Sequence, residues 1–163
     1  DMIIIRNNHP ILDNEAELIG SISCGTVKSV SLSLLTNKGI VAGTSGLNWG
    51  QRDKRNRNEA YIRIPIQIAR QDFFPTDRHF TVLTDDGHQL ILRAEQQNNK
   101  ALTTPMNNSL LGEYFRNRLN LLNGHPVTKQ DLERYGRTDV VFAKIDEELY
   151  YMDFSPKKAL GDS

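Results

Sequence analysis

The chain has 163 residues, of which 38% are hydrophobic and 25% are charged, and its 20 basic residues balance its 20 acidic residues. This composition predicts one soluble globular domain with a core of its own. The balance of charge argues against a non-specific nucleic-acid-binding tail, which would be strongly basic. No apolar run approaches the roughly 20 residues of a membrane helix, so we expect no membrane partner.

Residues 1–26 are predicted to be a linker or peripheral segment, because Pro10 and Gly20 would interrupt any long element. The segment has no basic region followed by a small-residue cleavage site, so we expect no signal peptide. It begins without methionine, which favours a domain taken from a longer protein. The single cysteine, Cys24, excludes an internal disulfide and a cysteine zinc site, and a reducing cytoplasm is the expected location. We assign the folded domain to residues 27–155 and a C-terminal tail to residues 156–163.

The first half of the domain carries short strand patterns. Serine alternates with apolar side chains over residues 29–36, which predicts a strand, and a TNKG turn then precedes a possible returning strand at residues 40–44. Residues 61–66 alternate in the same way, with their three isoleucines on one side. A helical turn is expected over residues 66–74, because the chain must leave the helical region before Pro75.

The second half predicts two hairpins. Residues 79–95 contain two alternating runs joined by Asp86 and Gly87, a pair that suits a tight turn. Residues 139–154 are expected to close the sheet as a second hairpin, with its turn at residues 146–148.

Two helices are expected between these hairpins. Residues 110–122 place leucine and aromatic side chains on one helical face, with Asn108 or Ser109 at the start and Gly124 at the end. A shorter helix over residues 128–136 begins with a TKQD capping sequence and stops at glycine. The sum is a mainly β domain of about seven short strands and two short helices, which favours a small barrel or sandwich.

Charge is distributed unevenly along this neutral chain. Residues 46–70 contain six basic and two acidic side chains, whereas residues 139–154 contain five acidic and one basic. Two polar segments stand out on the predicted scaffold, residues 48–58 and residues 96–104. One face of the domain could therefore meet a polyanion while the opposite face stays in solvent.

Catalytic and cofactor motifs are absent from the sequence. None of the four histidines has the spacing of a helical metal pair, and there is no HExxH, glycine-rich phosphate loop or HxK phosphohydrolase motif. Because catalysis needs titratable groups that converge, we expect no active site, no metal and no cofactor in this chain.

The polar segments contain the side chains that read base edges in the DNA major groove. Arginine pairs with guanine O6 and N7, asparagine and glutamine pair with adenine, and a carboxylate such as Asp53 accepts from cytosine N4. Trp49 is expected to anchor the base of the first segment. The alternative for each segment is structural: a solvated loop for the first and a hairpin turn for the second. Arg116 and Arg118 are expected to be ordinary surface residues.

Several spaced motifs resemble one family. AYIRIP, FFP, the following hairpin and GRTDVVF resemble the B3-like DNA-binding domain, and SGLNWGQR, NNSLLGEYFRNRL and YGRTDV are similar to the version carried by NgoFVII-family restriction endonucleases. The resemblance covers about residues 30–154. It implies a seven-stranded open pseudobarrel that grips double-stranded DNA and places an N-arm and a C-arm in the major groove. One departure is that Arg137 and Thr138 separate Gly136 from Asp139, where the plant version has Gly-Asp adjacent.

Carried over by position, the N-arm is the loop before Tyr61, residues 49–58. The C-arm follows the strand at residues 89–94 and covers residues 96–104. The N-arm candidates for DNA contact are polar or charged: Asn48, Gln51, Arg52, Asp53, Lys54, Arg55, Arg57 and Asn58. The C-arm candidates are Arg93, Gln96, Gln97, Asn98, Asn99, Lys100 and Thr103.

In the resembled family a phospholipase D-type nuclease domain lies N-terminal to this module and is covalently linked to it. Its histidine-lysine motif is absent here, so the resemblance implies a recognition domain without catalysis, with residues 1–26 as part of the connection. The alternative is a non-catalytic module that binds a protein, RNA or carbohydrate through the same two loops.

Overall fold

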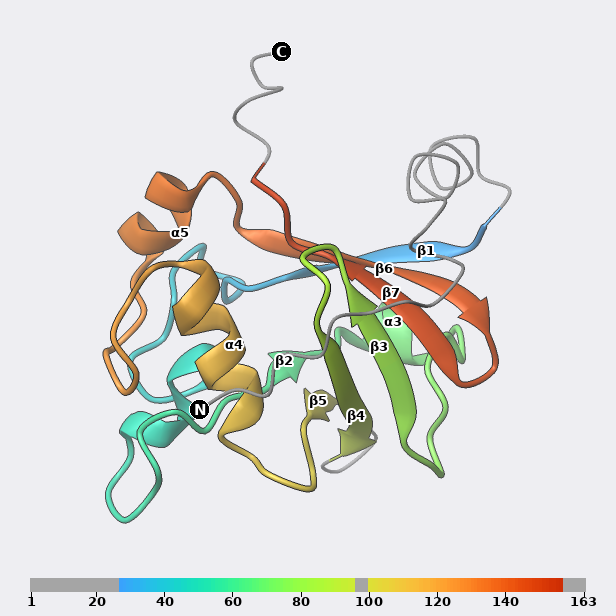
Figure 1. Cartoon of the computed structure of the whole chain (residues 1–163), viewed down its shortest axis with the longest axis horizontal. Helices are drawn as coiled ribbons and strands as arrows, with labels where there is room; N and C mark the ends of the chain where they lie inside the picture. Colours follow the sequence, from blue (N-terminus) through green and yellow to red (C-terminus); the bar gives the residue numbers. More distant parts are fainter. Residues whose placement is uncertain (1–26, 96–99, 157–163) are drawn as a thin grey trace.

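The computed structural model describes residues 27–95 and 100–156 (Figure 1). Its strands and helical segments are short, and α3 is a single turn. In order the elements are β1 (Ser29–Ser33), η1 (Gly46–Gln51), β2 (Ile62–Arg63), α3 (Ile66–Ala69), β3 (Phe80–Thr84), β4 (Gln89–Glu95), β5 (Ala101–Thr103), α4 (Leu110–Arg118), α5 (Lys129–Tyr135), β6 (Asp139–Asp146) and β7 (Leu149–Asp153).

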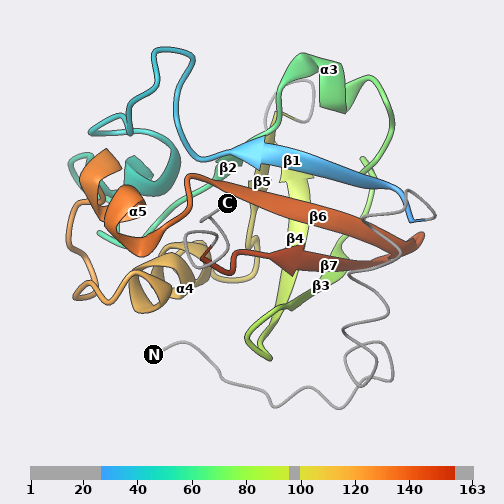
Figure 2. The same ribbon diagram turned by 90° about the horizontal axis from the view of Figure 1, so that it is seen from above.

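The strands form one seven-stranded mixed sheet in the order β1-β6-β7-β3-β4-β5-β2. Neighbouring strands are antiparallel except β3 and β7, which run parallel. The edge strands β1 and β2 approach each other, but no backbone ladder joins them in the described chain, so the barrel keeps one open seam (Figure 2). This confirms the predicted seven-stranded open pseudobarrel.

Alternation of side chains builds the sheet. In β1 the serines face outward, and Val30 and Leu32 are buried opposite Phe142 and Val140 of β6. The β3–β4 hairpin forms as predicted, with Gly87 in the left-handed conformation at φ +85°. The β6–β7 hairpin is also confirmed.

An aromatic cluster fills the barrel. The ring of Phe74 lies 5.5 Å from Phe80, 5.2 Å from Phe142 and 5.4 Å from Tyr150, between ring centroids. The Tyr150 hydroxyl donates to the backbone carbonyl of Phe73, so its polar end is satisfied although the side chain is fully buried. The cluster makes the scaffold rigid enough to hold loops in fixed positions.

Two strand predictions were wrong. Residues 40–44 form no strand, and the seventh strand is instead β5, inside the segment that was assigned to the C-arm. The chain does turn after Thr36, whose N–H donates to the carbonyl of Ile40 at 2.7 Å, but it then leaves β1 for η1. Ile66 was also expected beside two buried isoleucines, yet it begins α3 and is 43% exposed, because Pro65 ends the strand geometry.

α4 and α5 gather with η1 on one side of the barrel, whereas α3 lies apart from them (Figure 1). α5 is confirmed: Thr128 and Asp131 form a capping box, and Gly136 ends the helix at φ +107°. α4 is shorter than predicted, because Asn120 adopts φ +60° and the N–H of Leu121 donates to the carbonyl of Arg116 at 2.8 Å. This arrangement stops a helix, and it leaves Leu122 80% exposed rather than in the core.

None of the helices in the described ranges is both long enough and apolar enough to span a membrane.

Candidate nucleic-acid interface

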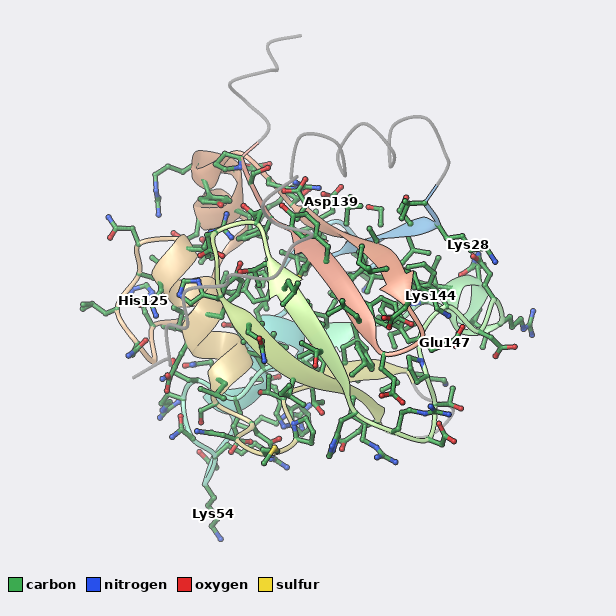
Figure 3. All side chains as sticks on the ribbon, turned by 45° about the vertical axis from the view of Figure 1, so that its right-hand side comes forward. Lys28, Lys54, His125, Asp139, Lys144 and Glu147 are labelled. Atoms are coloured by element: carbon green, nitrogen blue, oxygen red, sulfur yellow. The ribbon has the colours of Figure 1, made fainter. Side chains whose placement is uncertain are left out.

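The N-arm is a loop that projects from the barrel after η1. Its residues 52–57 are all exposed, and Lys54 adopts φ +65° at the tip. Figure 3 shows the Lys54 side chain pointing away from the body of the domain. The ends of β4 and β5 that flank residues 96–99 lie on the same lower side of the molecule in Figure 1. The two candidate arms therefore border one face.

The base of the N-arm is rigid. The N–H of Gly50 donates to the carbonyl of Glu59 at 2.8 Å, and the N–H of Glu59 donates to the carbonyl of Asn56 at 3.0 Å. The backbones approach so closely that a Cβ atom at Gly50 would lie 2.0 Å from the carbonyl oxygen of Asn56. Only glycine fits there. Backbone hydrogen bonds between residues 50, 56 and 59 therefore close the base of the loop.

Trp49 anchors the loop, as the sequence predicted. Its half-buried ring meets Tyr61 edge to face, with 5.8 Å between ring centroids. The guanidinium carbons of Arg52 and Arg55 lie 4.2 Å and 4.5 Å from the indole centroid. One aromatic ring therefore supports two cations of the exposed loop.

Two of the predicted N-arm contacts are instead part of the framework. Asn48 is 2% exposed; its amide nitrogen donates to the carbonyls of Ala42 and Val127 at 2.9 and 2.8 Å, and its Oδ1 accepts from the N–H of Val127 at 2.8 Å. Asn58 is 9% exposed, and its Oδ1 accepts from the N–H of Gly124 at 2.7 Å. Buried amides that are hydrogen-bonded in this way hold the arm in place and cannot reach a base.

Gln51 and Arg57 support each other across the arm. The Gln51 amide nitrogen donates to the carbonyls of Arg57 at 2.9 Å and Gly124 at 3.3 Å, and Nη1 of Arg57 donates back to the carbonyl of Gln51 at 3.3 Å. Arg57 remains exposed despite this bond. Asp53, also exposed, is the acidic side chain at the outer end of the loop.

Arg116 was expected at the surface and is fully buried. Its guanidinium donates to the carbonyls of His125 at 2.8 Å, Gly112 at 3.2 Å and Leu47 at 3.2 Å. Burial lowers the pKa of Arg116 to about 10, which still leaves it charged at neutral pH. The side chain ties α4 and the loop after it to η1, and so fixes the base of the N-arm.

Arg118 was also expected at the surface and is largely buried. Two of its nitrogens grip the Asp85 carboxylate at 3.0 and 2.9 Å, and a third contact joins Nη2 to the Tyr135 hydroxyl at 2.8 Å. Burial opposes its charge, but the hydrogen bonds that it donates to Asp85 outweigh this and raise the pKa of Arg118. The side chain joins α4 to the β3–β4 turn and to α5, so it serves the scaffold.

A strand face runs from the N-arm to the C-arm. In β2, β5 and β4 the side chains of Ile62, Leu102 and Ala94 share one row and are buried in the barrel. Because side chains alternate across a sheet, Arg63 and Arg93 lie on the outer face. Tyr61, which precedes β2 and contacts Trp49, extends this face to the base of the N-arm.

The described part of the C-arm is short. Lys100 is exposed, and its carbonyl accepts from the N–H of Ile64 at 2.6 Å. Thr103 pairs with Arg93 in the β5–β4 ladder, and its hydroxyl donates to Oε1 of Glu95 at 3.0 Å. Gln96, Gln97, Asn98 and Asn99 lie outside the described residues.

The sequence of residues 23–146 matches the family described as the NgoFVII C-terminal B3-like DNA-binding domain. The chain belongs to this family. Comparison with curated proteins gives no match. Among solved structures, a hypothetical protein of Arabidopsis thaliana is similar at 12% identity and a TM-score of 0.39, over 77% of this chain and 87% of that one. That score is too low to carry an argument.

The B3-like domain carries a group of cations on the face with the arms. The exposed ones are Arg52, Lys54, Arg55, Arg57, Arg63 and Lys100, and Arg93 is half-buried. Two acids of the same region are engaged: Glu59 pairs with Arg55 at 2.9 Å, and Glu95 accepts from Thr103. The acidic β6–β7 turn lies elsewhere, as the labels of Lys54 and Glu147 in Figure 3 show. Tyr61 and Arg63 were not among the predicted site residues, although the alternation of residues 61–66 places them opposite the buried isoleucines.

Proposed function

We propose that this B3-like domain recognises a specific sequence of double-stranded DNA by placing the N-arm and the C-arm in the major groove. The family to which the chain belongs is one of DNA-binding domains. The observation that carries the finer proposal is the N-arm itself: a rigid, exposed loop whose arginines are held over a fixed indole. Arginines that are positioned before binding lose little freedom when they meet base edges.

The proposed contacts divide by what each side chain can offer. Arginines of the N-arm supply forked donors that match guanine, and Asp53 can accept from the amino group of cytosine. Lys54 at the tip of the N-arm and Lys100 within the C-arm supply point charges that suit phosphates. Gln96, Gln97, Asn98 and Asn99 stay proposed C-arm contacts, because their amides suit adenine.

The outer strand face is the proposed floor of the interface. Arg63 and Arg93 project from it between the arms, and Thr103 adds a hydroxyl. These groups are suited to the DNA backbone, where contacts fix the register of a protein on the duplex without specifying sequence. Sequence would then be read by the arms alone.

We also propose that the parent protein is a restriction endonuclease of the cytoplasm whose linked N-terminal nuclease domain, of the phospholipase D type, cuts the DNA. The B3-like domain would deliver that nuclease to its site. No metal or cofactor is required for this role, because recognition rests on hydrogen bonds and charge.

The test is selection from a random duplex pool with the purified domain. A single consensus of a few base pairs is the expected result, and it should include G·C pairs. Affinity for that duplex should fall steeply as salt rises, because each neutralised phosphate releases counterions. Recovery of no consensus, or binding to a protein, RNA or carbohydrate with no salt dependence, would contradict the proposal.

A further inference from the structure

Trp49 and Arg52 pack together at the base of the N-arm, with the guanidinium of Arg52 over the indole. We infer that Trp49 is a positioning residue that holds Arg52 ready for a guanine, and that Arg52 is the base-reading arginine of the N-arm. The inference rests on the proposed function and assigns a role to one side chain among several similar ones.

Trp49 is itself held by two sets of contacts. It lies in η1, whose next residue, Gly50, is locked against Glu59 and Asn56. Its ring meets Tyr61 edge to face. The ring is therefore held in place, and the guanidinium of Arg52, whose carbon lies 4.2 Å from the ring centroid, is held beside it.

Arg52 is held so that its outer nitrogens have no hydrogen-bond partner in the part of the chain that the structure describes. Its Nε donates to the carbonyl of Thr44 at 2.8 Å, and its guanidinium lies over the indole. Within the described residues Nη1 and Nη2 donate no hydrogen bond. Two parallel N–H groups on a rigid plane match guanine O6 and N7.

Arg55 and Arg57 are differently placed. Nη1 of Arg55 pairs with Glu59 at 2.9 Å, which neutralises part of its charge and engages one of its terminal nitrogens. Nη1 of Arg57 donates to the carbonyl of Gln51. Each of these arginines therefore has a terminal nitrogen committed to the loop. Among the arginines of residues 52–57, Arg52 is the one whose two terminal nitrogens both remain available to a base.

The test compares variants by selection from the random duplex pool, followed by titration of the recovered consensus duplex and its single-base substitutions. Arg52→Lys keeps the charge and removes the fork. It should relax one guanine position of the consensus, with a loss of preference of roughly 5- to 150-fold, and leave the salt dependence unchanged. Trp49→Leu should relax the same position, and Trp49→Phe, which keeps an aromatic support, should restore part of the preference.

Two further variants serve as matched controls. Lys54→Ala should weaken binding to all sequences equally and lower the salt slope by about 1, because it removes a phosphate contact. Lys129→Ala, on α5 away from the arms, should change neither quantity. If Trp49→Leu does not fold, Arg52→Lys and Trp49→Phe still decide the question.

Trp49 also supplies a direct signal, since it is the chain's one tryptophan. Its fluorescence emission should change when the consensus duplex binds, because the guanidinium held beside the indole then meets a guanine and both groups lose water. Unchanged emission on binding would overturn this inference. So would Arg52→Lys and Trp49→Leu variants that both select the wild-type consensus with undiminished preference for each base. Either result would leave the proposed function standing. A uniform loss over all sequences in Arg52→Lys would mark a phosphate contact and also overturn the inference. A wild-type domain that recovers no consensus would overturn both.

Discussion

Replacing Arg116 with methionine tests the claim that the N-arm is held by a buried cation. Methionine fills the space of the aliphatic stem but donates nothing, so the carbonyls of Leu47 and His125 lose their donor. The carbonyl of Gly112 is less affected, because a helical carbonyl also accepts from the backbone N–H four residues later. The change therefore removes the arginine donor from one buried acceptor, the Leu47 carbonyl, and one partly buried acceptor, the His125 carbonyl.

The expected loss of stability follows from these two acceptors. Each unsatisfied buried carbonyl costs about 1–3 kcal/mol, so the two together cost at most about 2–6 kcal/mol. The partial exposure of the His125 carbonyl and the relief of the arginine's desolvation both reduce this cost, so we expect a net loss in the lower part of the range, roughly 2–4 kcal/mol. At about 3 °C for each kcal/mol, the unfolding midpoint should fall by roughly 6–12 °C.

The assay is thermal unfolding by circular dichroism, with Arg134→Met on α5 as the matched control. Arg134 pairs with Asp131 at 2.7 Å, but its side chain is 64% exposed, and exposed ion pairs contribute about 0–1 kcal/mol. If Arg116→Met lowers the midpoint no more than Arg134→Met does, the buried hydrogen bonds do not stabilise the arm and the reasoning is refuted. Well below its midpoint, Arg116→Met should also lose preference for the consensus duplex, because η1 is no longer tied to α4.

Two further substitutions test the framework. Gly112→Ala would place a Cβ atom 1.8 Å from the carbonyl oxygen of Asn58, so we expect α4 to separate from the end of the N-arm. This separation should appear as faster amide hydrogen exchange in both segments. Unchanged exchange would show that the close contact is unimportant. Thr128→Ala removes the α5 cap and should lower stability at pH 7 by about 1 kcal/mol. Burial raises the pKa of Asp131, but hydrogen bonds from Thr128 outweigh this and hold the pKa below its ordinary value. The Asp131 carboxylate therefore stabilises the fold above about pH 4, and this stabilisation is lost as the pH falls through the folded pKa. The stability gap between wild type and Thr128→Ala should therefore narrow on acidification, and a constant gap would contradict the assignment.

Much of the fold follows from the period of the side chains. Local sequence was enough to predict three features: the serine alternation of β1, the tight turn at Gly87 and the capping box of α5. β5 could not be predicted in this way, because three residues between polar neighbours carry no period, and only pairing with β4 and β2 makes them a strand.

The site was predictable in part for a similar reason. A loop rich in arginine and asparagine can be recognised as exposed, but its amides look alike in sequence. Asn48 and Asn58 are distinguished from surface amides only by long-range partners, Val127 and Gly124. Arg116 is misleading in the same way, because the acceptor that draws it inward, the carbonyl of Leu47, lies far away in the sequence.

The central claim is that the arms read the major groove of duplex DNA, and methylation interference on the selected consensus duplex tests it most directly. Dimethyl sulfate modifies guanine at N7 in the major groove and adenine at N3 in the minor groove, so one reagent probes both grooves. We predict that N7 methylation of one or more guanines within the site blocks binding, while N3 methylation of adenines has no effect. Interference confined to adenine N3, with methylated guanines bound normally, would contradict the claim.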